Sequence, residues 1–237
     1  SLAHAETPLN ADIAYQAQKR IDKDYHLGTV IGVIDKNGPR YYGFGSMSLS
    51  NAKTPDLHSI FEIGSIAKVY TATLLADLER SGDLKITTPL ETIVTEARHT
   101  VQTAGRTVTL ENLMTHTAGL PRNPTNTDDN DDDRYKEYTA EDLKGFLTSY
   151  RITPENTGFY YSNTGTLVLE HAIETKTNMS YENLMQKRIF KPLGLKNTYF
   201  RVPESKQHLL VTGYRNGEET EPLDVGSFPA MGGILTS

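Results

Sequence analysis

The chain has 237 residues, of which 37% are hydrophobic and 23% charged, a composition typical of a globular protein. This length can bury a large core, as one large domain or as two modest ones. The formal charge of −6 argues against a nucleic-acid surface and against binding to anionic membranes. The absence of cysteine excludes disulfides and thiolate metal sites, and no apolar run approaches the length of a membrane span.

A helix and a hairpin are the first elements predicted. Asn10 is a suitable N-cap for a helix with apolar residues on one face. Two β-rich runs, 29–35 and 40–45, flank Asn37-Gly38 and predict an antiparallel hairpin.

Residues 60–70 form a short apolar segment that runs directly into a helix. Ser65 lies in the first turn of this helix and Lys68 lies one turn later, so the two side chains share a face. A serine is a poor nucleophile until a neighbouring base takes its proton, and serine–lysine pairs can do this. Ser50 and Lys53 have the same spacing, but they lie in a polar stretch that predicts a loop, so the spacing alone is not specific.

The middle of the chain is mostly helical, and strands return near its end. Helical signals cover residues 109–116, a capping box at Thr139, residues 166–175, and the span from Ser180 to Phe190. Residues 209–214 with a turn at 215–217 predict a second hairpin.

This order predicts an α+β module in which a mostly helical lobe is inserted into an antiparallel sheet lobe flanked by helices. We expect the sheet lobe to comprise residues 1–64 with 205–237 and the helical lobe residues 65–204, together forming one catalytic module. The Ser65 helix would lie at the seam, where ligand sites tend to form.

An acidic run at 128–133 suggests calcium, but it lacks the glycine and the bidentate glutamate of an EF-hand loop. A solvated surface loop is the better interpretation. The sequence predicts no metal site and no cofactor.

A second constellation is Tyr161 and Asn163, which would project to the same side of an extended segment. A phenol beside a lysine ammonium loses its proton more easily, and could carry protons between the serine and a leaving group. The asparagine amide offers a donor and an acceptor to an amide-like substrate. The spacing recurs at Tyr181 and at Tyr214, where packing and turn formation explain it.

These motifs together resemble the penicillin-recognising serine hydrolases, which include class C β-lactamases, D-Ala-D-Ala carboxypeptidases and related esterases. Ser65 to Lys68 resembles the first motif of the family and Tyr161-Ser162-Asn163 the second. The likeness spans roughly residues 13–237 in the right order. Three further stretches contribute to it: 113–121, 189–198 and 231–237.

The resemblance implies roles for four residues. Ser65 would be the acylated nucleophile, with Lys68 as its base or the partner of the base. Tyr161 would shuttle a proton to the leaving group, and Asn163 would hold the substrate amide. The backbone N–H of Ser65 would form half of an oxyanion hole. His116 lies in a stretch that is a structural turn in the family, so we do not expect it to be catalytic.

The third motif of the family, Lys or His followed by Thr or Ser and then Gly, is absent from these 237 residues. Three explanations are open: the chain is the N-terminal portion of a longer protein, the missing strands lie on a second chain, or the protein is a shortened pseudoenzyme. We favour the first two, because strands 29–35 and 40–45 would otherwise belong to an unfinished, exposed sheet.

The sequence therefore predicts a serine acyl-enzyme hydrolase whose substrate is a D-Ala-D-Ala-like cell-wall peptide, a β-lactam or an ester. A non-catalytic cell-wall binding or regulatory module with the same fold is the alternative. Ala3-x-Ala5 fits the end of a cleaved signal peptide and predicts an exported protein, periplasmic or extracellular; a remnant of cloning is the other interpretation.

Overall fold

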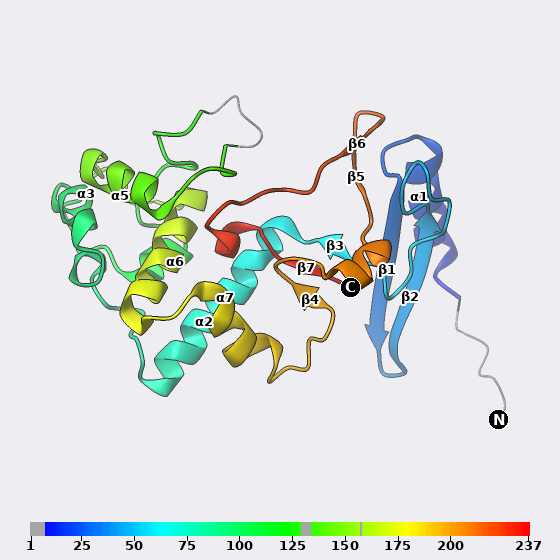
Figure 1. Ribbon diagram of the computed structural model, residues 1–237, viewed down its shortest axis with the longest axis horizontal. Coiled ribbons are helices and arrows are strands. Elements are labelled where there is room, and N and C mark those ends of the chain that lie inside the picture. Colours follow the sequence, from blue (N-terminus) through cyan, green and yellow to red (C-terminus); the bar gives the residue numbers. More distant parts are fainter. Residues whose placement is uncertain (1–7, 129–133, 157) are drawn as a thin grey trace. The chain divides into compact units, whose positions relative to one another are not determined.

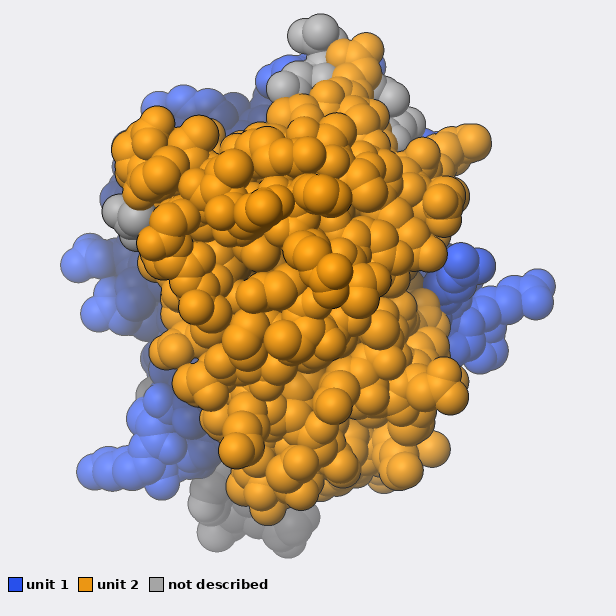
Figure 2. Space-filling model, turned by 90° about the vertical axis from the view of Figure 1, so that its left-hand side faces the viewer, with its two compact units in different colours: residues 1–61, 201–222, 235–237 blue, residues 62–200, 223–234 orange. Residues whose placement is uncertain are grey.

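The computed structural model describes residues 8–128, 134–156 and 158–237 of the chain. Two compact units can be distinguished (Figure 2). Unit 1 comprises residues 1–61, 201–222 and 235–237, and unit 2 comprises residues 62–200 and 223–234. The two-lobe division predicted from the sequence stays a prediction.

Unit 1 is built on one helix and two hairpins (Figure 1). Helix α1 (Ala11–Asp22) follows Asn10, whose side chain accepts hydrogen bonds from two free backbone N–H groups, so the predicted cap is confirmed. Strands β1 (Gly28–Asp35) and β2 (Gly38–Gly45) pair antiparallel with Gly28 opposite Gly45, which confirms the first hairpin.

The second hairpin is shorter than predicted. It consists of β5 (Gly213–Arg215) and β6 (Glu218–Thr220), whereas Leu210 forms an isolated parallel bridge with Ile60 instead. A 3-10 helix covers Glu204–Leu209 just before it.

Three strands have only two residues each. They are β3 (Phe61–Glu62), at the boundary of the two units, β4 (Thr198–Tyr199) in unit 2 and β7 (Leu235–Thr236) in unit 1.

Unit 2 is helical and holds the hydrophobic core. Its helices are α2 (Ala67–Ser81), α3 (Arg98–Gln102), α4 (Leu110–Met114), α5 (Ala140–Ser149), α6 (Asn163–Thr177) and α7 (Tyr181–Met185). Short 3-10 turns cover Gly64–Ile66, Leu90–Thr92, Thr95–Ala97 and Pro229–Met231. Of the described buried apolar residues, only Ala17, Met47 and Ile60 belong to unit 1; the others form one cluster in unit 2. The packing energy of the described chain is therefore concentrated in unit 2.

Most helices of unit 2 begin and end where the sequence predicts. Thr139 forms a capping box with Asp142 at the start of α5, and Gly82 ends α2 in the left-handed conformation. Two details differ. Helix α6 begins at Asn163, three residues early, because the Ser162 side chain accepts the N–H of Gly165 and caps it. The predicted helix from Ser180 continues beyond α7 as a π-helix over Gln186–Phe190.

Two sequence predictions lie outside the described residues: most of the acidic run at 128–133, and the proposed signal remnant at 1–5. Within the ranges that are described, no helix is both long enough and apolar enough to cross a membrane.

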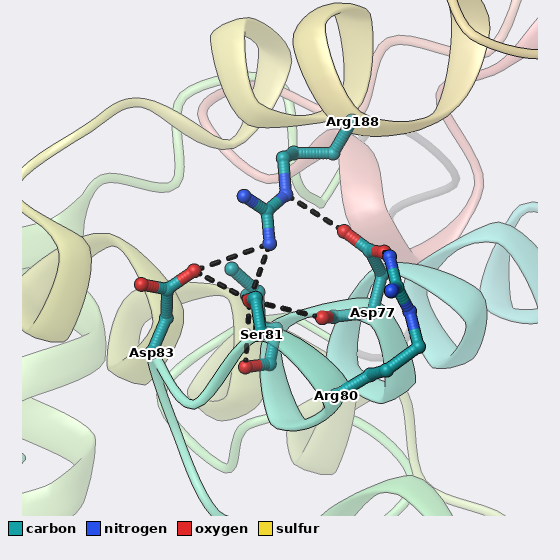
Figure 3. Close-up of polar contacts among 6 residues, drawn as sticks. Asp77, Arg80, Ser81, Asp83 and Arg188 are labelled. Carbon is teal, nitrogen blue, oxygen red and sulfur yellow. Dashed lines mark hydrogen bonds and ion pairs between the residues drawn. The ribbon is translucent and has the colours of Figure 1, made fainter.

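A cluster of hydrogen bonds and ion pairs connects the π-helix to the end of α2 (Figure 3). The Arg188 guanidinium donates to Asp77 at 2.7 Å and to Asp83 at 3.1 Å, and it also contacts Ser81. The side chains of Arg188 and Asp77 are 25% and 20% exposed, so water screens this pair less than a fully exposed pair. Arg80 also binds Asp77, but its own side chain is 79% exposed.

We expect Arg188→Met to lower the free energy of unfolding by about 1 kcal/mol at pH 7, because one guanidinium serves two carboxylates. The matched variant Arg80→Met removes an exposed partner of the same carboxylate and should cost only about 0.3 kcal/mol. Arg80 and then Arg188 lower the pKa of Asp77, so the Arg188 contribution is present above the ordinary carboxyl pKa and is lost as the pH falls through the lowered value. Urea unfolding of both variants at pH 7 and in acid checks this; equal losses at pH 7 would contradict it.

Candidate active site

Ser65 lies in the 3-10 turn that leads into α2. Gly64 before it has φ +49°, a left-handed conformation that glycine adopts without strain, and the turn then passes directly into the helix at Ala67. Ser65 is exposed, whereas Lys68, one turn later, is only 5% exposed. The predicted arrangement of a surface hydroxyl above a buried amine on one helix face is therefore present.

The structure brings Tyr161 to this pair. The Tyr161 hydroxyl donates to Ser65 Oγ at 2.8 Å, and Lys68 Nζ lies 3.4 Å from the same oxygen. Lys68 also donates to the backbone carbonyl of Met231 at 2.7 Å and lies 5.1 Å from the centre of the Tyr161 ring. Three side chains predicted from two separate motifs thus meet around one oxygen atom.

Tyr161 is held in place by backbone hydrogen bonds on both sides of it. The N–H of Tyr160 donates to the carbonyl of His116 at 2.8 Å, and the N–H of Asn163 donates to the carbonyl of Arg122 at 2.8 Å. The Ser162 hydroxyl donates to the carbonyl of Pro121. The carbonyls of residues 116–122, which we call the 116–122 template, therefore hold the segment 160–163 in place by hydrogen bonds.

His116 supports this template. Its φ of +59° is unusual for a residue with a side chain, its Nδ1 accepts the N–H of Ser162 at 3.2 Å, and its ring lies 4.6 Å from that of Tyr161. Burial and the positive charge of Lys68 lower the pKa of His116, which favours the neutral ring that this hydrogen bond requires. His116 binds Ser162 rather than Ser65, so its contacts are those of a positioning residue.

Both candidate proton carriers have shifted pKa values. Burial lowers the pKa of Lys68, Arg122 lowers it further, and Tyr161 opposes the shift. Burial raises the pKa of Tyr161, but interactions with Lys68 and Ser65 and the charge of Arg122 outweigh it, so the net shift is downward. Each group is therefore closer to exchanging its proton at neutral pH than an isolated lysine or tyrosine.

Asn163 is the predicted site residue whose surroundings differ from expectation. It is the first residue of α6 rather than part of an extended segment, because Ser162 caps the helix. Its side-chain amide lies 3.2 Å from that of Asn123. Asn163 is thus close in sequence to Tyr161, but it contacts Asn123 rather than Ser65.

Sequence reasoning missed two contributors to this site. Arg122 places its guanidinium 5.3 Å from the centre of the Tyr161 ring, where its charge favours the phenolate. The other is the carbonyl of Met231, a backbone atom 163 positions away from Lys68. Arg122 directly follows the stretch 113–121 and could have been found there, but a backbone acceptor leaves no signal in a sequence.

A cavity of about 410 Å³ near this segment is lined by residues that include Tyr150, Phe159 and Tyr160. Ser65, Lys68 and Tyr161 are not among its lining residues, so we do not assign the reaction to it. Across the part of the chain that the structure describes, no group of three or more His, Asp or Glu side chains could hold a metal ion.

Comparisons with known proteins identify the family of the chain. A family model described as "Beta-lactamase" matches residues 16–237. Penicillin-binding protein 4 of Amycolatopsis lactamdurans is 30% identical over 170 residues, which are 70% of this chain and 43% of that protein. The D-alanyl-D-alanine-carboxypeptidase/endopeptidase AmpH of Escherichia coli strain K12 is 28% identical over 193 residues, which are 78% of this chain and 48% of that protein.

The fold agrees as well. The crystal structure of a class C β-lactamase from Rhodobacter sphaeroides superposes with a TM-score of 0.79 at 27% identity, covering 94% of this chain and 61% of that one. The chain spans about half the length of the curated relatives it matches. The resemblance found in the sequence is therefore confirmed, and the chain belongs to the β-lactamase family of penicillin-recognising serine hydrolases, with the α+β fold of class C enzymes.

Proposed function

We propose that this protein is a hydrolase that works through an acyl-enzyme on Ser65. The observation that carries the proposal is the convergence on Ser65 Oγ of the Tyr161 hydroxyl at 2.8 Å and Lys68 Nζ at 3.4 Å. A serine hydroxyl becomes a nucleophile when a neighbouring base accepts its proton, and both neighbours have pKa values shifted toward neutrality.

In the first half of the reaction Ser65 Oγ attacks the carbonyl carbon of the substrate, and the serine proton passes to Lys68 or Tyr161. The tetrahedral intermediate then collapses, the bond to the amine or alcohol breaks, and Tyr161 delivers a proton to that leaving group. In the second half water attacks the ester on Ser65, releasing the acid and restoring the hydroxyl. Lys68 and Tyr161 are both candidates for the first base, because each lies within 3.4 Å of Ser65 Oγ.

Two further groups have proposed roles toward the substrate. The backbone N–H of Ser65, at the start of α2, would donate to the oxyanion, where one such donor is worth about 3 kcal/mol. The Asn163 amide would hold the substrate amide by a donor and an acceptor.

We propose an exported enzyme acting on D-Ala-D-Ala-like cell-wall peptides, β-lactams or esters. The Tyr161-Ser162-Asn163 motif resembles the carboxypeptidase and esterase branches more than the β-lactamases, which favours a peptide or an ester. A carboxypeptidase/endopeptidase and a penicillin-binding protein among the relatives support this choice.

The first test is acylation of Ser65, measured by intact-mass spectrometry of the full-length protein. We expect a covalent adduct after incubation with benzylpenicillin or with a fluorophosphonate, because each carries an electrophile for an activated serine. Ser65→Ala should give none, while Ser50→Ala, which alters the other Ser-x-x-Lys sequence, should label like the wild type. An adduct that persists in Ser65→Ala would overturn the assignment.

Tyr161→Phe removes the hydroxyl and keeps the ring that packs on His116. The acylation rate should fall by about 100-fold or more, the usual worth of a positioned proton carrier. Tyr160→Phe is the matched control, because Tyr160 is exposed and its contact with the 116–122 segment is made by its backbone N–H. Stopped-flow acylation measures both; equal rates in the two variants would count against the proposed role of Tyr161.

Arg122→Met should raise the pKa of Tyr161 and that of Lys68, because a positive charge disfavours protonation of both. The acidic limb of the kcat/KM profile should then move to higher pH. Arg122→Lys keeps the charge and should move it less. The profile is measured with p-nitrophenyl acetate, and a limb that stays in place or moves to lower pH in Arg122→Met would contradict this prediction.

A further inference from the structure

A carboxyl group lies buried in α6, outside the residues given catalytic roles above. Glu170 is only 1% exposed, and its Oε2 accepts the backbone N–H of Ala230 at 2.9 Å. Among the described residues no Lys, Arg or His forms an ion pair with it. Burial raises the pKa of Glu170 well above the ordinary carboxyl value, and the negative charges of Glu174 and Glu182 raise it further. Burial without a cationic partner therefore favours the neutral form of this acid, while the Ala230 N–H opposes the shift.

The backbone that Glu170 binds is the one that binds Lys68. In the turn Pro229–Met231, the Met231 carbonyl accepts from Lys68 at 2.7 Å. The Ala230 carbonyl accepts from Thr71 at 3.0 Å, while the N–H of Ala230 goes to Glu170. Helix α2 therefore binds two successive carbonyls of the turn, and α6 binds the Ala230 N–H that precedes both.

A third helix completes the network. The Tyr181 hydroxyl of α7 lies 2.9 Å from the Thr71 hydroxyl, and burial raises the pKa of Tyr181, so the phenol stays neutral. Lys68 is the only basic side chain of this buried set, and its anchoring acceptor is a carbonyl. A carbonyl orients the amine without the increase in pKa that a carboxylate would cause.

We propose that Glu170 is a positioning residue for Lys68: by holding the Ala230 N–H it fixes the Met231 carbonyl, and through it the place of Lys68 Nζ beside Ser65. This inference rests on the proposed function of Ser65 and Lys68. Small displacements of a catalytic group are costly, so loosening the turn slows acylation although Glu170 itself touches neither Ser65 nor the substrate.

Two substitutions distinguish the hydrogen bond from the Ala230 N–H to Glu170, which we call the anchor, from the volume that the Glu170 side chain fills in the core. Glu170→Gln keeps the shape and an acceptor oxygen for the Ala230 N–H, whereas Glu170→Met keeps the volume and has no such acceptor. Glu182→Gln is the matched control, because it removes a nearby exposed carboxylate that does not bind the turn.

The first measurement is hydrogen exchange of the peptide spanning residues 225–234 in the full-length protein. We expect the Ala230 amide to exchange at least about tenfold faster in Glu170→Met, and at the wild-type rate in Glu170→Gln and Glu182→Gln. Unchanged exchange in Glu170→Met would overturn the anchor, whatever the activity. The measurement needs no turnover, so it is independent of the proposed function.

The second measurement is the rate at which a fluorophosphonate labels Ser65, at a temperature where near-ultraviolet circular dichroism shows every variant folded. Glu170→Met should label about 10- to 100-fold more slowly, and Glu170→Gln should restore the rate. Faster exchange with an unchanged labelling rate would overturn the positioning role. No labelling of the wild type would remove the proposed function on which the inference rests, while the exchange result would still decide the anchor.

The third measurement is the pH dependence of stability, which reports the protonated carboxyl. Because folding raises the pKa of Glu170, unfolding releases a proton at any pH between the unfolded and folded values. Over that range the unfolding constant of the wild type, relative to Glu170→Gln, should increase with pH by up to about tenfold per unit. Below the unfolded pKa the ratio should be constant. A ratio that does not change with pH would show that the carboxyl is not held as a neutral acid.

Discussion

The arrangement of this site depends on where a buried lysine finds an acceptor. Lys68 is almost fully enclosed, and an ammonium without partners is strongly disfavoured there, so its hydrogen bond to the Met231 carbonyl is what makes its position possible. A carboxylate in that place would hold the proton firmly and deprive the amine of any use as a base. With a carbonyl as partner, burial lowers the pKa of Lys68 while its direction toward Ser65 is kept.

Because the acceptor is a backbone carbonyl, the position of Lys68 depends on how firmly the backbone at Met231 is held. A carbonyl orients a side chain only if its own peptide is fixed, and the turn at 229–231 belongs to no long helix or strand. Bonds from Thr71 and to Glu170 supply the rigidity that regular structure would otherwise provide. Packing adds a steric constraint: a Cβ on Gly233 would lie 2.7 Å from Val225 and 3.0 Å from Pro229, so any other residue there would force these neighbours to shift.

The sequence predicts those parts of the site that depend on local geometry. The spacing of Ser65 and Lys68 places them on one helix face, and the caps at Asn10 and Thr139 locate two helices correctly. The sequence places the start of α6 three residues too late, because the spacing of Tyr161 and Asn163 suggests an extended segment, although Ser162 is itself a good N-cap. The Met231 carbonyl and Glu170 could not be found this way, since both act through contacts between distant segments of the chain.

The role of Tyr161 depends both on a local sequence motif and on contacts between distant segments of the chain. Its presence in a motif with Asn163 is visible in the sequence, but its proximity to Ser65 depends on the strained His116 and on the carbonyls of the 116–122 template. The same template carries Arg122, so the segment that fixes the position of the phenol also supplies the positive charge that favours its ionisation. The position of the Tyr161 phenol and the positive charge of Arg122 beside it are therefore linked. A substitution that moves residues 116–122 changes both the geometry and the pKa of Tyr161.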